Sequence, residues 1–301
     1  MTQFGIDISK WQNGFDFDKA KKEGVEFIIL RGAYTTSKDV CFDKFYEACK
    51  DRNIPVGVYL YSMARNVAEA KNEANKLINN VLKGKTFEYP IYMDVEDKAL
   101  KALGKDKLTD VIIAFCETLE KAGYYVGIYS TAYFLKTYTH EEKLEKYDKW
   151  IAQWTKKCTY GKDYGMWQFG GETNEVRTNK VAGVVCDQDY CYKDYPSIIK
   201  KAGLNGFTKL KSVSVVAREV IQGKWGVGND RINKLTEAGY NYKEVQAKVN
   251  AMLTTKSNTV IAKEVIQGKW GSGEERKKKL TEAGYEYSAI QKLVNEMMKN
   301  T

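Results

Sequence analysis

The strongest constraint on the fold is an alternation between short apolar runs and amphipathic segments that continues through residues 1–205. The run VEFIILRGAY precedes CFDKFYEACKDRN, and PVGVYLYSMA precedes VAEAKNEANKLINNVL, in which apolar residues recur at helical spacing. This alternation is typical of βα units with buried parallel strands. Five such units are followed by three apolar runs with little helix between them, KWIAQW, GMWQF and VVCDQDY.

Eight strands with helices around most of them favour a closed barrel over an open sheet. The sequence therefore predicts an α/β fold, an irregular TIM-like β/α barrel of five βα units followed by helix-poor strands. No GxGxxG follows the first strand, FGIDIS, which argues against a dinucleotide-binding sheet.

The last third of the chain contains an internal repeat. VVAREVIQGKWGVGNDRINKLTEAGYNY, from Val215, recurs as VIAKEVIQGKWGSGEERKKKLTEAGYEY, from Val260, with 24 identities over forty aligned positions. Each copy predicts three short helices forming a small bundle, the first with Val216, Val220 and Ile221 on one face. Trp225 and Trp270 are expected to anchor the two cores.

The predicted domains are a barrel over 1–205 and two repeats over 213–254 and 258–300. The polar stretch TTKSNT, residues 254–259, is interpreted as the linker between the repeats. Gly239 is expected to end the second helix of the first repeat.

The formal charge of +9 is concentrated in the repeats. Residues 206–301 carry 17 Lys and Arg against 10 Asp and Glu, whereas the remainder carries 31 against 29. A basic module indicates an anionic partner, which leaves nucleic acid, a membrane surface and an acidic wall polymer as alternatives. No zinc-finger pattern or dense basic helix supports nucleic acid. No apolar run is long enough to span a bilayer, so membrane insertion is not expected.

The N-terminal stretch MTQFGIDISKWQ lacks the basic and apolar regions of a secretory signal, so synthesis in a cytoplasm is expected. Reduced thiols are then expected for the six cysteines. Cys186 and Cys191 have no CxxC partner or nearby histidine to complete a zinc set, and no metal or cofactor is predicted. The single histidine, His140, lies in a polar run and is expected at the surface. Hydrolytic chemistry must therefore rest on carboxylates.

Acidic residues gather at the predicted strand ends, where barrel enzymes carry their catalytic side chains. The first strand supplies Asp7, the fourth supplies Asp94 and Glu96, and the last supplies Asp187 and Asp189. Because residues i and i+2 of a strand share a face, the Cα atoms of Asp94 and Glu96 should lie about 6.5–7 Å apart on one side.

Asp97 points elsewhere and is expected to face solvent or cap a helix. Any one of these acids alone is best explained as a helix cap or a lysine partner, but several converging from separate strands indicate a site. A magnesium or calcium site remains an alternative, although such a site favours carbonyl and amide ligands over aromatic side chains.

Aromatic residues near the strand ends add a second indication. Tyr61, Tyr129 and Trp154 fall late in their strands, where flat rings stack on sugars, and Tyr34 lies at the end of the second strand. Paired carboxylates beside aromatic side chains suit glycoside hydrolysis.

The segments DISKWQ, FIILRGAY, PVGVYLYS, YMDVED, GIYS, KWIAQW, MWQF and VVCDQDY, in this order over about residues 1–195, resemble the lysozymes of glycoside hydrolase family 25. The resemblance implies cleavage of the β-1,4 bond between N-acetylmuramic acid and N-acetylglucosamine in peptidoglycan. It implies that Glu96 is the general acid, that Asp94 stabilises positive charge or orients the 2-acetamido group, and that Asp7 and Asp187 line the site. Asp187 is preferred to Asp189 because it takes the place of the family's final-strand Asp.

The implied substrate-binding residues are Tyr34, Tyr61, Tyr129, Trp154 and Gln168. Attack by the neighbouring acetamide and direct attack by water both remain open.

The repeats, through IQGKWG and LTEAGY, resemble the wall-binding repeats of phage lysozymes that do not need choline. The resemblance implies wall targeting by a phage or prophage endolysin that another protein helps to release, with a host autolysin as the alternative. The candidate wall contacts are Arg218, Lys224, Arg231, Lys263, Lys269 and Arg276. A rival interpretation is a non-catalytic wall-attachment protein that uses the barrel as a scaffold.

Overall fold

The structure is a computed structural model that describes residues 2–254, 257–283 and 285–299. The chain forms two compact units, Met1–Leu210 and Lys211–Thr301, and each is described by itself. In the part of the chain that is described, no helix combines the length and the apolar character needed to cross a membrane.

The first unit is a closed barrel of eight strands. The strands in sheet order are β1 (Gln3–Ile8), β11 (Asp187–Cys191), β8 (Met166–Gly170), β7 (Asp148–Ala152), β6 (Val126–Thr131), β5 (Ile91–Asp94), β4 (Val56–Tyr61) and β2 (Phe27–Tyr34). Pairing of β1 with β2 closes the ring. A short strand β3 (Ser37–Lys38) pairs with the end of β2, and β9 (Lys180–Val181) pairs with β10 (Val184–Val185) outside the barrel. The predicted irregular β/α barrel is confirmed.

The direction of the last barrel strand, β11, differs from the prediction. β11 pairs antiparallel with both β1 and β8, whereas the other neighbours in the ring are parallel. Asp187 is the first residue of β11, so the placement of Asp187 and Asp189 at the C-terminal end of the last strand was wrong. Because this strand is reversed, its first residue lies beside Asp7 near the C-terminal end of β1.

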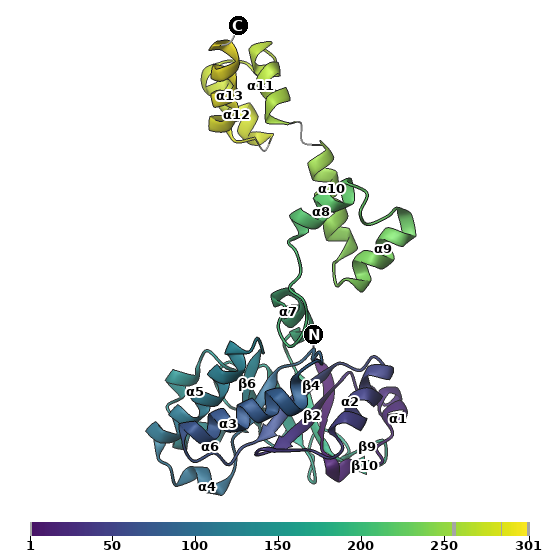
Figure 1. Cartoon of the computed structure of the whole chain (residues 1–301), viewed down its shortest axis with the longest axis vertical. Coiled ribbons are helices and arrows are strands. Elements are labelled where there is room, and N and C mark those ends of the chain that lie inside the picture. Colours follow the sequence, from purple (N-terminus) through teal and green to yellow (C-terminus); the bar gives the residue numbers. More distant parts are fainter. Residues whose placement is uncertain (1, 255–256, 284, 300–301) are drawn as a thin grey trace. The chain divides into compact units, whose positions relative to one another are not determined.

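Helices pack around the outside of the barrel, except the last, whose Tyr195 and Ile199 join the aromatic core of the interior (Figure 1). They are α1 (Phe17–Lys22), α2 (Phe42–Asp51), α3 (Val67–Leu77) with a π-helical turn over Ile78–Leu82, α4 (Lys98–Lys101), α5 (Lys105–Lys121), α6 (Ala132–Tyr138) and α7 (Tyr195–Ala202). Two 3-10 turns cover Lys10–Gln12 and Glu141–Leu144. The helix α5 shows why they form, since Leu108, Ile112, Phe115 and Leu119 recur at helical spacing and are all buried.

Aromatic side chains fill the barrel interior. The ring of Trp150 lies 4.5 Å from Tyr129, 5.1 Å from Tyr92 and 6.2 Å from Tyr59, measured between centroids. Gly127 makes room for this packing, because a Cβ there would lie 2.4 Å from the ring of Tyr92. A second apolar core, rich in Ile, Val, Leu and Phe, lies between the strands and the helices.

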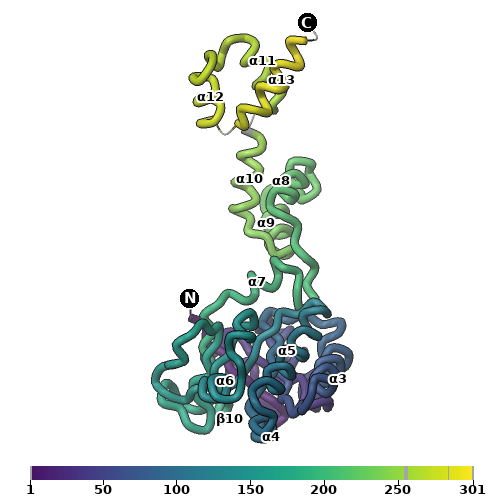
Figure 2. Tube along the Cα trace, turned by 90° about the vertical axis from the view of Figure 1, so that its left-hand side faces the viewer, coloured from purple at the N-terminus to yellow at the C-terminus, as the bar shows by residue number. Residues whose placement is uncertain are grey.

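The second unit contains two three-helix repeats. The first consists of α8 (Val213–Ile221), α9 (Gly228–Glu237) and α10 (Tyr242–Thr254), and the second of α11 (Asn258–Ile266), α12 (Gly273–Glu282) and α13 (Tyr287–Lys299). Figure 2 shows the three helices of each repeat grouped together. Each repeat has its own core, built from Val216, Val220, Leu235, Val245 and Val249 in the first and the matching residues in the second.

Several details of the repeats differ from expectation. Ile221 was placed on the buried face but is 44% exposed, because α8 ends there. The predicted linker is too long, since Thr254 belongs to α10 and Asn258 begins α11; residues 255 and 256 lie outside the described residues. Gly239 follows α9 with a φ of 85°, as predicted for a helix end. Trp225 is half-buried against the core, and its indole Nε1 donates to Glu219.

Asn205 ties the end of the first unit to the base of the barrel. This fully buried residue has a left-handed backbone with a φ of 53°. Its Nδ2 donates to the carbonyls of Phe87 (3.2 Å) and Tyr89 (2.8 Å), and its Oδ1 accepts from the backbone N–H of Tyr125 (2.7 Å).

Replacing Asn205 by alanine should therefore destabilise the barrel. Three lost hydrogen bonds at roughly 1 kcal/mol each predict a fall of about 3 kcal/mol in the free energy of unfolding. Denaturant unfolding of the full chain, followed by tryptophan fluorescence, measures this change. Asn72→Ala, on the exposed face of α3, is the matched control and should change the free energy by less than about 0.5 kcal/mol. Equal effects of the two substitutions would contradict the assignment.

Candidate active site

A cavity of about 220 Å³ opens at the mouth of the barrel, where the parallel strands end. Its lining consists of Asp7, Ile8, Ser9, Trp11, Gln12, Arg31, Tyr59, Tyr61, Asp94, Glu96, Tyr129, Trp150, Gln168 and Asp187. The structure thus brings together all four acids that the sequence predicts as catalytic. Three of the five predicted substrate-binding residues also line it.

The barrel positions each acid through its strand pairing. Asp7 lies in β1 directly opposite Asp187 of β11, and Asp94 ends β5 between Tyr61 of β4 and Tyr129 of β6. β5 ends at Asp94, so Glu96 lies two residues beyond the strand, but both acids line the cavity while Val95 between them packs into the outer core. The loop thus brings the side chain of Glu96 to the same cavity.

Asp97 has a structural place outside the cavity. It is the N-cap of α4, where its Oδ1 accepts the backbone N–H of Ala99 at 2.7 Å, which confirms the predicted cap. Its Oδ2 accepts the hydroxyl of Tyr61 at 3.0 Å. The residue that caps the helix therefore also orients one of the aromatic side chains of the cavity.

Burial dominates the electrostatics of the acids. It raises the pKa of Asp7 well above the ordinary range, with a further contribution from the charge of Asp187. Burial and the charge of Glu96 raise the pKa of Asp94 in the same way, and they raise that of Asp187 to about 7. The pKa of Glu96 is also raised, by loss of solvent around its carboxyl and by Asp97.

Arg31 is the cation that lines this cavity. Its guanidinium forms two contacts with Asp39, at 2.8 Å through Nε and 2.7 Å through a terminal nitrogen, and its charge lowers the pKa of Asp94. Asp39 also accepts the backbone N–H groups of Lys10 and Cys41. The arginine is therefore held in a fixed position in the cavity lining.

A hydrogen-bonded chain links three predicted substrate-binding residues to Asp7. The hydroxyl of Tyr129 (2.9 Å) and the indole N–H of Trp154 (3.0 Å) both donate to Oε1 of Gln168. The Nε2 of Gln168 then donates to Oδ2 of Asp7 at 2.9 Å. Gln168 thus connects two aromatic side chains to the carboxyl of Asp7 and helps to fix the orientation of all three.

Two predicted aromatic residues lie outside the cavity lining. Trp154 is 38% exposed, and Tyr34 is 46% exposed and stacks on Tyr61 with ring centroids 5.1 Å apart. The position of Tyr34 next to Tyr61 extends the aromatic surface beyond the cavity.

Among the lining residues that sequence reasoning did not assign to the site, Trp11 and Arg31 carry the clearest chemical features. Trp11 is 75% exposed on the 3-10 turn, which Ser9 and Gln12 fix through a capping box. An exposed tryptophan at a cavity mouth has no role in the core. Arg31 had a signal in the sequence, since a charged residue interrupts the apolar strand FIILRGAY.

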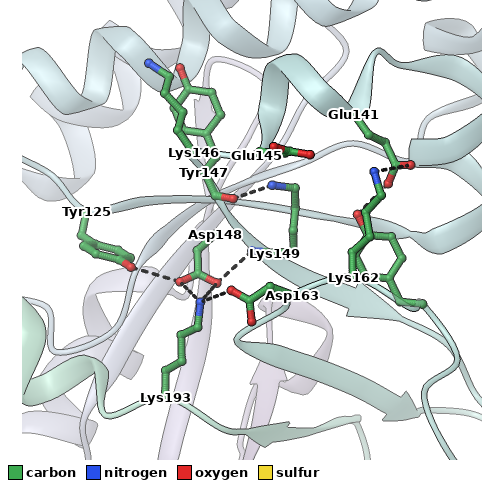
Figure 3. A pocket seen from close by; sticks show the side chains of 11 residues that line it. Tyr125, Glu141, Glu145, Lys146, Tyr147, Asp148, Lys149, Lys162, Asp163 and Lys193 are labelled. Atoms are coloured by element: carbon green, nitrogen blue, oxygen red, sulfur yellow. Dashed lines mark hydrogen bonds and ion pairs between the residues drawn. The ribbon is translucent and has the colours of Figure 1, made fainter.

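A larger cavity, of about 490 Å³, lies at the other end of the barrel around the start of β7 (Figure 3). Asp148 accepts the hydroxyl of Tyr125 and pairs with Lys193, which also contacts Asp163. The amine of Lys149 donates to the carbonyls of Leu144 and Tyr147. These groups satisfy one another at the N-terminal face of the barrel, where polar networks serve stability.

No group of three or more His, Cys, Asp or Glu side chains within the described ranges has the arrangement of a metal site. The six cysteines are free thiols. His140 is 30% exposed at the side chain and lies between Asp106 and Glu142, away from the cavity.

A β/α barrel with buried carboxyl groups and aromatic side chains at the C-terminal ends of its strands defines a glycoside hydrolase. Comparison with known families agrees. The family described as glycosyl hydrolases family 25 matches residues 6–177, and the chain belongs to this family. It is accordingly a glycoside hydrolase of the lysozyme type. The CW_7 repeat matches residues 215–253 and 259–298.

Relatives with curated names are lysozymes. The chain is 30% identical over 252 residues to the lysozyme of Streptococcus phage Cp-7, covering 81% of this chain and 68% of the relative. It is 25% identical over 151 residues to the autolytic lysozyme of Clostridium acetobutylicum, covering 50% of this chain and 44% of that protein.

Solved structures show the same fold. The autolysin LytC from Streptococcus pneumoniae, in complex with a synthetic peptidoglycan ligand, matches with a TM-score of 0.55 and 26% identity. The match covers 64% of this chain and 47% of LytC. The endolysin CTP1L matches with a TM-score of 0.55 and 22% identity, over 74% of this chain and 79% of that structure. The chain spans less than half the length of LytC and of the clostridial lysozyme.

Two substitutions of Asp97 distinguish a structural role of this residue from a catalytic one. Asp97→Ala removes the cap and the anchor of Tyr61, and should lower the free energy of unfolding by about 1 kcal/mol, the usual value of an N-cap. Asp97→Asn keeps Oδ1 as the cap acceptor, and its Nδ2 can donate to the hydroxyl of Tyr61, which can also accept, so this variant should stay close to the parent protein. Thermal unfolding of the two variants measures the difference. Loss of wall hydrolysis in the stable Asn variant would show instead that the charge of Asp97 takes part in catalysis.

Proposed function

We propose that the chain cleaves the β-1,4 bond between N-acetylmuramic acid and N-acetylglucosamine in bacterial peptidoglycan. The barrel, residues 1–205, carries the reaction, and repeats 213–254 and 258–300 hold the enzyme on the wall. The observation that supports this most is the convergence of Asp7, Asp94, Glu96 and Asp187 on one cavity in a family 25 barrel.

Glu96 is the general acid of this proposal. Its side chain lies at the opening of the cavity, where a glycosidic oxygen can approach, and its raised pKa keeps the carboxyl protonated at higher pH than a free glutamate. A protonated carboxyl is what the leaving oxygen requires.

Asp94 is proposed to assist the reaction by binding the substrate inside the cavity. Its carboxyl is buried, and its Oδ1 has no hydrogen-bond partner among the described residues, so it is available to a ligand. An amide N–H of a 2-acetamido group is a donor that fits this acceptor. Such a contact orients the acetamide for attack on the anomeric carbon, and it favours this route over direct attack by water. Retention of configuration in the first-formed product, measured by NMR, distinguishes the two routes.

Exposed aromatic side chains supply sugar contacts around the cavity. Trp11 at its edge, the stacked pair of Tyr34 and Tyr61, and Trp154 offer ring faces to a glycan chain. Sugar rings pack on such faces through their C–H groups, while the acids below contact the polar edges.

Glu96→Gln tests the proposed reaction. The amide cannot donate the proton, so the rate of wall hydrolysis should fall at least about a hundredfold, the usual contribution of a general acid. Loss of turbidity of a purified Gram-positive wall suspension measures the rate. Thermal unfolding and wall pull-down should remain as in the parent protein, because Glu96 is an exposed residue of the barrel.

Near-normal lysis by Glu96→Gln would exclude the assignment of the acid. Binding to the wall without lysis by the parent protein would favour the rival function, a wall-attachment protein with an inactive barrel.

Wall binding by the repeats is the second part of the proposal. Arg231 and Arg276, two of the predicted wall contacts, are half-buried braces within their repeats. Arg231 donates to the carbonyl of Gly226 (3.0 Å) and to Gln246 (3.3 Å), and Arg276 makes the same contacts with its own repeat. These contacts support a structural role for both arginines. Arg218 and Lys263 are exposed on α8 and α11.

Lys224 and Lys269 are better placed for wall contact. Each lines an open groove, of about 600 Å³ in the first repeat and about 630 Å³ in the second. The first groove is lined by Glu219, Lys224, Trp225, Lys234, Glu237 and Ala238, with Lys211 at its edge, and the second by the matching six residues 45 positions later. In both grooves the indole N–H donates to the glutamate at 3.1 Å. Neither Lys224 nor Lys269 forms an ion pair with another described residue.

The double substitution Lys224→Ala with Lys269→Ala should weaken wall pull-down by about tenfold, on the order of 1.4 kcal/mol, since both modules lose a contact at once. Titration of the full chain against purified walls measures the affinity. Lys243→Ala with Lys278→Ala removes the same charge from exposed sites outside the grooves and is the control. Equal loss in both variants would indicate only general charge attraction.

Walls stripped of phosphate-linked polymers identify the wall component. A loss of binding on these walls favours anionic polymers, and retained binding favours the glycan itself.

The likeness to the Cp-7 phage lysozyme supports an endolysin that acts on the wall after release with help from another protein. The clostridial autolytic lysozyme keeps a host autolysin as the alternative.

A further inference from the structure

Asp189 lies in the barrel wall behind the cavity and has no established role. It is in β11, two residues after Asp187, and its exposed fraction is zero. In the sheet it lies opposite Gly5 of β1 on one side and Gln168 of β8 on the other. A carboxyl so deeply buried requires either a cation, several donors or a proton.

The contacts of Asp189 leave one of its oxygens without an ordinary donor. Oδ1 accepts the indole N–H of Trp150 at 2.8 Å. Oδ2 is buried and has no donor among the described residues. Asp7 lies two residues after Gly5, the sheet partner of Asp189, so the two acids share one face of neighbouring strands. Two ionised carboxylates are both acceptors only, so neither can satisfy the other unless one of them carries a proton.

Among the residues that the structure describes, no cation forms an ion pair with either carboxyl. Arg31 is engaged by Asp39, and its influence falls on Asp94 and Tyr59. The charged and titratable groups around the pair, from the elements packed against it, are Asp187 and Cys186 on the β11 side, Tyr59 of β4, Asp94 and Glu96 of β5 and its loop, Tyr129 of β6, and Arg31 of β2. Most of these groups are acids, so they favour protonation of the pair.

We propose that Asp7 and Asp189 share one proton, and that Asp189 is a positioning residue for the active site. The proton on Asp189 donates to Asp7, while Gln168 donates to the other side of the same carboxyl. Asp7 is then held by two donors and carries one charge for the pair. Asp187 and Glu96, nearer the mouth, remain the groups that titrate toward the substrate. This inference rests on the proposed hydrolase function only for its activity measurements.

The direction of the pKa changes agrees with the contacts. Burial raises the pKa of both Asp7 and Asp189 well above the ordinary range, with the charge of Asp187 adding to it in each case. Such a pair releases its shared proton at a pH that belongs to the pair and not to either residue.

Asp189→Asn tests the shared proton directly. The amide oxygen still accepts from Trp150, and the amide nitrogen donates to Asp7 as the proposed proton does. Wall lysis should therefore stay within about threefold of the parent protein. Asp189→Leu has a similar size but no donor, so it should lower kcat on a soluble muropeptide at least about tenfold with a smaller change in KM. A merely structural role predicts equal kcat per folded molecule in both variants, which would overturn the proposal.

The pH dependence of stability gives a second measurement that does not use activity. A carboxyl with a raised folded-state pKa contributes stability that is fully present below the unfolded pKa, about 3.9, and is lost as the pH rises through the folded value. Asp189→Asn has no such proton to lose. Its melting temperature should therefore fall less than that of the parent protein between about pH 5 and pH 9. This range begins above the ordinary pKa of a carboxyl and extends through the raised pKa values of the folded protein.

Asp7→Asn is the second variant for this measurement, because its amide removes the same shared proton from the other side. It should flatten the pH dependence as well, whatever it does to catalysis. A parent-like decline with pH in both variants would overturn the shared proton. Glu96→Gln keeps the pair intact and removes only the contribution of Glu96, whose pKa is raised less than those of the pair, so it should retain most of the parent decline. Failure of the proposed reaction and failure of this inference therefore give different results.

Discussion

The antiparallel insertion of β11 between β1 and β8 is the interaction on which the active site depends. It places Asp187 directly opposite Asp7 and brings Asp189 to the indole of Trp150. In a parallel strand at this position, the first residue, Asp187, would lie at the N-terminal end of the barrel, far from Asp7. The strand that closes the barrel therefore also supplies two of the acids behind and beside the cavity.

Closing the barrel in this way concentrates carboxyl groups in a place with little solvent. Asp7, Asp94 and Asp189 are almost entirely buried, and each loses hydration that water would otherwise give to its charge. The fold offsets this with neutral donors from Gln168 and Trp150 and with a single arginine fixed by Asp39. These few donors do not make up for the lost hydration of every acid, so the raised pKa values of Asp7, Asp94 and Asp189 are a consequence of the fold. A general acid makes use of such a raised pKa.

Much of the barrel follows from local sequence pattern. The apolar runs and the helical spacing of α2, α3 and α5 predict their elements because burial of one face decides their structure. The direction of β11 does not follow, because antiparallel pairing needs no helical crossover and the connection from β8 holds only the short β9 and β10 pair. The carboxyl Asp94 ends its strand as the pattern indicates, and Glu96 lines the same cavity from the loop that follows the strand. Trp11 escaped notice because its exposed position has meaning only once the cavity is beside it.

Comparison of the two repeats separates positions that are identical because they pack in the core from identical positions at the surface. Core residues such as Leu235 and Leu280 are identical because each fills an equivalent interior. Some exposed positions away from the grooves differ, as Asn233 and Lys278 do, whereas others, such as Gln222 and Gln267, are the same. Lys234 and Lys279 are equally exposed yet unchanged, and both line the tryptophan grooves. Each lysine pairs with the acid four residues earlier in its helix, Asp230 or Glu275, but such exposed pairs contribute little to stability. The proposed wall binding offers a second reason for the identity, because two modules on one polymer gain from tandem binding only when both recognise the same repeating unit.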